Sequence, residues 1–148
     1  MLGFYAIRKL LEAGKVPDDL LAKGLRLRRF PSNGKPVTYI NYHRFPEFYD
    51  FAKPTRVTRD LLFVCNQIVH SYVFAPLFRS NGQLQGVVFN SDRTKNRELW
   101  FASVDEVVKA LRAVGRSDPA TVQMILDPAK GDYRVSVGES LVIRDATN

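Results

Sequence analysis

One long span between two prolines limits the possible folds of this chain more than any other feature. Residues 55–74 contain neither glycine nor proline, and Pro54 and Pro76 stand on either side of them, which is a common way for a helix to be delimited. At about 100° per residue, the apolar side chains of this span, among them Leu61 and Ile68, share one broad face. The pattern predicts a long, buried central helix over residues 55–74.

The segments around this span have the patterns of short helices and hairpins. Residues 25–28 alternate apolar and basic side chains, which is the period of a half-buried strand. Regular β-α-β alternation is absent, and this argues against a doubly wound parallel sheet. The sequence therefore predicts an α+β fold in which an antiparallel sheet built from hairpins packs on the long central helix, with short flanking helices.

The remaining elements follow from capping and turn residues. The expected strand pairs are residues 25–28 with 37–42, 84–90 with 97–102, and 133–137 with 141–143 around a turn at Gly138 and Glu139. The expected flanking helices cover residues 4–13, 17–23, 104–114 and 117–127, and the third of these starts with a capping box formed by Ser103 and Glu106. The aromatic residues 45–51 are expected to form a loop that packs on the core.

Composition indicates a single globular domain over residues 1–148. The chain has 148 residues, of which 45% are hydrophobic and 25% are charged, so it can bury a core without a metal or a disulfide. Cys65 is the only cysteine, and its apolar neighbours favour a small buried side chain over a reactive thiol. No apolar run is long enough to span a membrane and no secretory signal is recognisable, so a cytoplasmic location is expected.

Several common catalytic sites have no counterpart in the sequence. Neither G-x-x-x-x-G-K nor G-x-G-x-x-G occurs, and there is no G-x-S-x-G nucleophile motif, which lowers the expectation of an NTPase, a dehydrogenase or a serine hydrolase. One cysteine and two histidines are too few for a standard zinc site. We therefore expect no cofactor and no metal, although an enzyme whose site leaves no local motif stays open.

The first candidate site is formed by Asn66 and His70. Residues four apart lie on one helix face, so these side chains can converge on one point, and Arg59 lies farther along the same arc of the predicted helix. Histidine titrates near neutrality and can serve as an acid or a base. The plainer alternative is a polar patch at the helix edge, in which His70 is bonded to a backbone carbonyl.

Residues 65–70 read C-N-Q-I-V-H, which resembles the R-N-x-x-x-H helix motif of HEPN ribonucleases. In that family, an arginine and a histidine cleave RNA at a dimer interface between helical bundles. Cys65 stands where the family has its arginine, so the resemblance does not carry the catalytic role over. The predicted hairpins also differ from an all-helical bundle.

The second candidate site surrounds the other histidine, His43, beside the aromatic loop. If this loop folds over the central helix, His43 and His70 share a pocket with Asn66 and Tyr42, in which Arg44 or Arg59 holds an anionic group. Loops on rigid scaffolds often carry binding residues. Alternatively, the loop covers a hydrophobic edge, and His43 and Arg44 are solvated.

The third candidate site is a set of basic residues. The formal net charge is +7, which favours polyanionic partners. Arg26 and Arg28 alternate with leucines and so face one way, while Arg93, Lys95 and Arg97 lie in the loop of the second hairpin. Such arginines can follow a phosphate backbone. Alternatively, they protect an edge strand from aggregation and keep the hairpin loop soluble.

The sequence leaves three functions open. The leading hypothesis is a non-catalytic binding domain that contacts nucleic acid, or an acidic protein surface, through Arg26, Arg28, Arg93, Lys95 and Arg97. The competing hypothesis is a small ribonuclease- or hydrolase-like enzyme that uses His70 as its acid–base, with Asn66 and His43 orienting the substrate. The third is a homodimer that buries the aromatic loop, and no membrane partner is expected.

Overall fold

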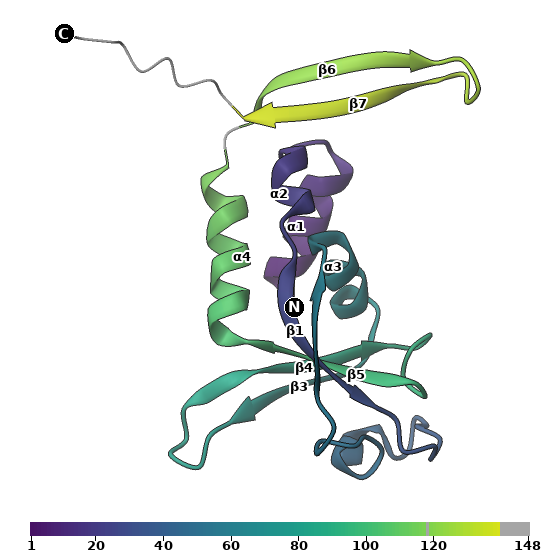
Figure 1. The fold of residues 1–148 in the computed structure, drawn as a ribbon, viewed down its shortest axis with the longest axis vertical. Coiled ribbons are helices and arrows are strands. Elements are labelled where there is room, and N and C mark those ends of the chain that lie inside the picture. Colours follow the sequence, from purple (N-terminus) through teal and green to yellow (C-terminus); the bar gives the residue numbers. More distant parts are fainter. Residues whose placement is uncertain (118, 140–148) are drawn as a thin grey trace, which may run out of the picture.

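The computed structural model describes residues 1–117 and 119–139, and these form an α+β fold with an antiparallel sheet. Its strands are β1 (Leu25–Pro31), β2 (Thr55–Arg59), β3 (Ser71–Phe78), β4 (Leu84–Ser91) and β5 (Glu98–Ser103). They lie in the order β2-β1-β5-β4-β3, and every neighbouring pair is antiparallel. The helices α1 (Leu2–Glu12), α2 (Asp18–Ala22), α3 (Leu61–Val69) and α4 (Val104–Arg116) lie on one side of this sheet (Figure 1).

The helix side of the sheet buries the larger core. Trp100 of β5 and Phe89 of β4 are paired across the two strands and are fully buried. Phe4 and Ile7 of α1 and Ile68 of α3 belong to the same cluster. Burial of each such side chain stabilises the fold by about 1.5–3 kcal/mol, so this cluster holds the helices on the sheet.

The other side of the sheet is only partly covered. The connection between β1 and β2, which contains the short 3₁₀ helix η1 (Tyr42–Glu47), places Phe48 and Tyr49 against Phe30 and Leu99. Phe48 and Tyr49 are 5% and 3% exposed, so the expected packing of the aromatic loop on the core is confirmed. The rest of this face, along β1, β2 and β5 towards α4, stays open.

The structure confirms the predicted hairpin of residues 84–90 and 97–102, which appears as β4 and β5. The helices expected at residues 4–13, 17–23 and 104–114 are present as α1, α2 and α4. Helix α4 continues through Gly115 to Arg116, because a glycine near the end of a helix weakens it without stopping it.

The prediction of one long helix over residues 55–74 is wrong, because this span contains β2, the nine-residue helix α3 and the start of β3. Three of residues 55–59 are β-branched (Thr55, Val57 and Thr58), which suits a strand, and the segment pairs with β1. Asp60 then caps α3, since its Oδ1 accepts a hydrogen bond from the Phe63 backbone N–H at 2.7 Å. Pro76 lies inside β3, which tolerates it as the edge strand of the sheet.

Two further strand assignments differ from the prediction. Residues 37–42 do not pair with residues 25–28, because β1 pairs instead with the distant strands β2 and β5. Residues 119–127 form no helix. They form strand β6 (Pro119–Asp127), which pairs with β7 (Asp132–Glu139) in a separate two-stranded sheet.

The β6–β7 pairing also removes the predicted turn at Gly138 and Glu139, which lie within β7. The turn of this hairpin is instead at Asp127, whose carbonyl accepts hydrogen bonds from the N–H groups of Lys130 and Gly131. The β6–β7 hairpin contacts helix α2, where Asp18 Oδ2 accepts a hydrogen bond from the Val137 N–H. The predicted strand at residues 141–143 lies outside the described residues.

Candidate functional site

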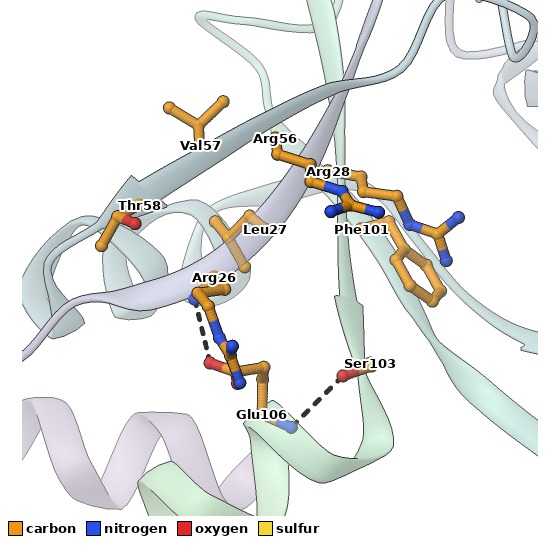
Figure 2. A pocket seen from close by; sticks show the side chains of 9 residues that line it. All are labelled: Arg26, Leu27, Arg28, Arg56, Val57, Thr58, Phe101, Ser103 and Glu106. Carbon is orange, nitrogen blue, oxygen red and sulfur yellow. Dashed lines mark hydrogen bonds and ion pairs between the residues drawn. The ribbon is translucent and has the colours of Figure 1, made fainter.

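The open part of the sheet carries arginine side chains from two neighbouring strands. In the register of β1 and β2, Arg26 is paired with Thr58, and Arg28 is paired with Arg56. Leu27, between the two β1 arginines, is 2% exposed and belongs to the helix-side core. Because side chains alternate along a strand, the paired residues project to the opposite face. Figure 2 shows them around one hollow of about 430 Å³, which we call the arginine hollow.

An aromatic ring fixes the position of Arg28. The Arg28 guanidinium carbon lies 4.4 Å from the centre of the Phe101 ring on β5, within the range of a cation–π interaction. Phe101 is 3% exposed, so its ring serves as a rigid support under the arginine. Gly86 on β4 makes room for this ring, since a Cβ at that position would lie 2.7 Å from a Phe101 ring atom.

Glu106 binds Arg26 and closes one side of the arginine hollow. Its Oε1 accepts hydrogen bonds from Arg26 Nη2 and Nε at 2.9 and 3.1 Å, and its Oε2 accepts from the Arg26 backbone N–H at 2.9 Å. Burial acts to raise the pKa of Glu106, but the hydrogen bonds and charge of Arg26 outweigh it, so the pKa is below its ordinary value. Glu106 is therefore a carboxylate at neutral pH, and it neutralises Arg26.

The same contacts change the predicted capping box. Ser103 Oγ does accept a hydrogen bond from the Glu106 N–H at 3.3 Å, as the sequence predicts. The Glu106 side chain, however, reaches the Arg26 backbone on β1 and not the N-cap backbone of its own helix. Strand β1 lies next to β5, which leads directly into α4. A hydrogen bond between Glu106 and the β1 backbone has therefore replaced the predicted bond within the helix.

Arg28 and Arg56 remain as uncompensated charges in the arginine hollow. Within the part of the chain that the structure describes, neither guanidinium has an acidic partner within 4.0 Å. Like charges on directly opposite strand positions destabilise a sheet. Arg28 and Arg56 therefore lie opposite each other without an acidic partner among the described residues.

The second basic group of the sequence does not join this hollow. Lys95 Nζ binds Asp92 at 2.7 Å and lies 3.7 Å from the centre of the Tyr72 ring; the hydrogen bond to Asp92 is the main reason that its pKa is raised. Arg97 Nη2 donates to the Arg93 carbonyl at 3.4 Å. Arg93, Lys95 and Arg97 therefore cannot be grouped with Arg26 and Arg28 as lining of one site.

Asn66 and His70 line a different hollow, of about 580 Å³, at the end of α3. We call it the α3 hollow. His70 caps the C-terminus of the helix, and its Nε2 lies 2.7 Å from Arg8 Nη1. Because arginine can only donate, Nε2 accepts this bond. The partner of His70 is therefore an arginine of α1, whereas the sequence analysis considered a backbone carbonyl.

The predicted pocket shared by His43 and His70 is absent from the described structure. His43, Tyr42 and Arg44 belong to η1, and none of them lines the α3 hollow. The Tyr42 ring lies 6.1 Å from the ring of Tyr72 on β3. The expectation failed because the central helix, over which the loop was to fold, does not exist as one rod.

Arg59 also lies apart from Asn66 and His70, because it belongs to β2 and not to α3. Its guanidinium carbon lies 5.1 and 5.4 Å from the ring centres of Phe63 and Trp100. Among the described residues, its buried Nε has no hydrogen-bond partner. Arg59 is thus held by aromatic rings next to the core, and it lines neither hollow.

Sequence reasoning missed Arg56 and Phe101 as neighbours of Arg28, and Glu106 as the partner of Arg26. The β-branched residues Thr55, Val57 and Thr58 were a signal that Arg56 lies in a strand. The approach of Phe101 and Glu106 depends on the pairing of β1 with β5, about which the local pattern carries no information.

Two findings concern metal sites and membrane-spanning helices. Among residues 1–117 and 119–139, no group of three or more histidine, cysteine, aspartate or glutamate side chains could hold a metal ion. In the same ranges, no helix has the length and apolar character needed to cross a membrane.

Comparison with known proteins adds no family to this description. No protein-family model matches the chain, and neither a curated protein nor a solved structure matches it.

Proposed function

We propose that this protein binds a single strand of nucleic acid across the open face of its five-stranded sheet, with phosphate groups held at the arginine hollow. The observation that carries the proposal is the pair Arg28 and Arg56, which lie opposite each other on adjacent strands without an acidic partner within the described residues. Phosphate oxygens would compensate both guanidiniums and remove the repulsion between them.

The support under Arg28 favours a planar, bidentate ligand. The cation–π contact with Phe101 limits the positions that the guanidinium can take, so less conformational entropy is lost when its N–H groups bind phosphate oxygens. A base can also stack on the outer face of such a guanidinium. The Arg26–Glu106 pair would lie beside the bound nucleic acid and form one side of the site.

The overall charge supports a polyanion over a small neutral ligand. The chain carries a formal net charge of +7, and a basic protein attracts nucleic acid over long range at low salt. An acidic protein surface is the less favoured partner. Its carboxylates would be held by a flexible side chain each, whereas a nucleic-acid strand presents phosphates at regular spacing.

Fluorescence anisotropy with a labelled RNA and a labelled DNA oligonucleotide of the same sequence tests the proposal. The variant Arg28→Ala/Arg56→Ala should bind the preferred oligonucleotide at least roughly tenfold more weakly than the unaltered protein at low salt, given about 1 kcal/mol or more for each charged contact. The matched control is Arg112→Ala/Arg116→Ala, which removes the same charge from exposed positions of α4. Equal loss in both variants would mean that net charge alone drives binding.

The competing enzyme hypothesis retains one supporting observation, the shared hollow of Asn66 and His70. His43, Arg44 and Arg59 do not line this hollow, so such an enzyme would have to act without them. Its His70 Nε2 would also accept a hydrogen bond from Arg8 Nη1. A His70→Ala variant incubated with RNA and with generic esters is the test, and activity equal to that of the unaltered protein would end the hypothesis.

Two further expectations from the sequence remain proposals. A cytoplasmic location agrees with the state of Cys65, which is buried, with burial raising its pKa to about 12. Such a thiol is unreactive at neutral pH.

A homodimer through the aromatic loop is less favoured, because Phe48 and Tyr49 are already buried against their own sheet; light scattering is the direct test.

A further inference from the structure

We infer that the α3 hollow is a second binding site, which takes a ligand of the size and chemistry of a mononucleotide. The hollow has a volume of about 580 Å³ and is lined by Phe63, Asn66, Gln67, His70, Ser91, Asp92 and Arg93. None of these residues lines the arginine hollow. The inference therefore does not depend on binding of nucleic acid at the sheet face.

The inference depends mainly on Gln67, a buried side chain whose amide nitrogen makes no hydrogen bond to the described residues. Gln67 is 8% exposed. Its Oε1 accepts hydrogen bonds from the Ser91 N–H at 2.9 Å and the Thr94 hydroxyl at 3.0 Å, which fixes the orientation of the amide. The Nε2 group then has no partner among the residues that the structure describes.

A buried polar group is normally hydrogen-bonded, and leaving one without a partner costs free energy. Gln67 lines the α3 hollow, and its Nε2 keeps some accessible surface, since it is absent from the fully buried unpartnered atoms of the described structure. The Ser91 N–H and the Thr94 hydroxyl both donate to Gln67 Oε1. The N–H groups of Nε2 therefore remain available to donate to an acceptor on a ligand in the hollow.

His70 adds a second donor to the same hollow. Arg8 Nη1 donates to His70 Nε2 at 2.7 Å, and a neutral imidazole whose Nε2 accepts must carry its proton on Nδ1. Arg8 is in turn held by Glu12, since its Nε donates to Glu12 Oε1 at 2.9 Å. The chain of contacts from α1 thus fixes which nitrogen of His70 can donate to a ligand.

Arg93 makes the hollow attractive to an anion. Its guanidinium has no acidic partner within the described ranges, while Asp92, the carboxylate of the hollow, is paired with Lys95 Nζ at 2.7 Å. The free charge in the hollow is therefore positive. A phosphate monoester is the anion that we assign to Arg93, because guanidinium and phosphate can form two parallel hydrogen bonds.

The remaining wall suits a nucleobase. Gln67 Nε2 offers donors for a carbonyl or ring nitrogen, and the Asn66 amide, which has no hydrogen bond within the described structure, offers both a donor and an acceptor. Phe63 gives an apolar surface beside them. A volume of about 580 Å³ lies within the range of roughly 300–1,000 Å³ that is usual for small-molecule sites.

Isothermal titration calorimetry of the full chain, with adenosine, guanosine, cytidine and uridine 5′-monophosphates and with inorganic phosphate, tests the inference. At least one nucleotide should bind more tightly than phosphate. Arg93→Ala should weaken that nucleotide by roughly tenfold or more, and Asn66→Ala should weaken the nucleotide but leave phosphate unchanged. In ¹⁵N NMR spectra, the Gln67 side-chain amide signal should shift on addition of the nucleotide.

Arg79→Ala is the matched control, since it removes one exposed arginine from the turn between β3 and β4 and should leave nucleotide affinity as it was. Absence of binding by every nucleotide would overturn the inference. So would equal losses in Arg93→Ala and Arg79→Ala, or equal affinities for phosphate and all nucleotides. The arginine pair of the sheet face is intact in all these variants, so failure here leaves the proposed function standing.

Discussion

At the scale of single residues, Glu106 joins the helix layer to the open face of the sheet. Its carboxylate accepts from the Arg26 backbone and guanidinium, while its own N–H is capped by Ser103. The Arg26 side chain is 78% exposed, so the side-chain ion pair contributes little. Most of the stabilisation by Glu106 therefore comes from the charged hydrogen bond to the β1 backbone.

Replacing Glu106 by glutamine should lower the free energy of unfolding by about 1 kcal/mol at neutral pH, the difference between a charged and a neutral acceptor. Urea denaturation measures it. Glu47→Gln is the control, because the Arg44–Glu47 pair at 3.8 Å is exposed on both sides and its loss should not be measurable. A loss in the control as large as in Glu106→Gln would contradict this reading.

The stability that Glu106 provides should also depend on pH. Its pKa is lower in the folded protein than its ordinary value, so the contribution is fully present above the unfolded pKa of about 4.3 and is lost as the pH falls through the lower folded value. The difference in unfolding free energy between the unaltered protein and Glu106→Gln should therefore shrink on acidification below about pH 4. A difference that grows there would show the opposite sign of linkage.

Two glycines should respond in opposite directions to replacement by alanine. At Gly86 a Cβ would clash with the Ala102 backbone carbonyl oxygen and lie 2.7 Å from a Phe101 ring atom, so Gly86→Ala should destabilise the protein by about 1–3 kcal/mol or more and displace the support of Arg28. At Gly115 in α4, a Cβ would meet nothing within 4 Å, so Gly115→Ala should stabilise by about 0.5–1 kcal/mol. Thermal denaturation compares them, and a shift of the same sign in both would contradict the packing described.

At the scale of elements, local signals predicted some of the parts whose partners are near in sequence, but they missed the β3–β4 and β6–β7 hairpins. The hairpin of β4 and β5 and the helices α1, α2 and α4 follow from turn residues, caps and periodicity. The prediction for residues 55–74 failed at both ends, because residues 55–59 pair with β1, which is distant in the chain, and residues 71–74 pair with β4, the next strand along the chain. Absence of glycine and proline does not distinguish a helix from a strand–helix–strand unit, and the β-branched residues of 55–59 favoured the latter.

Asp60 marks the boundary that sequence reasoning missed, and its role can be measured. Asp60→Ala removes the acceptor of the Phe63 N–H and should destabilise the protein by about 1 kcal/mol, as loss of an N-cap usually does. Asp60→Asn keeps a capping oxygen and should retain most of the stability. Chemical denaturation of the two variants gives the answer, and equal losses would mean that charge, and not capping, matters at this position.

At the scale of the whole molecule, the helices lie on one side of the sheet (Figure 1), and the arginine hollow is lined by residues of β1, β2 and β5 together with Glu106 of α4 (Figure 2). Alternation in residues 25–28 was enough to place Arg26 and Arg28 on one face. It could not show that Glu106 neutralises Arg26, that Arg56 lies opposite Arg28 or that Phe101 supports it. These three contacts depend on long-range pairing, and they narrow the proposed binding surface from the basic residues of the chain to one arginine pair.

The salt dependence of oligonucleotide binding tests this central claim most directly. For a single strand, the slope of log affinity against log salt changes by about 0.7 for each phosphate contact. The slope for Arg28→Ala/Arg56→Ala should therefore be shallower than that of the unaltered protein by roughly 1.4, whereas Arg112→Ala/Arg116→Ala should keep the original slope. A slope that stays the same without Arg28 and Arg56 would contradict the assignment of phosphates to this face.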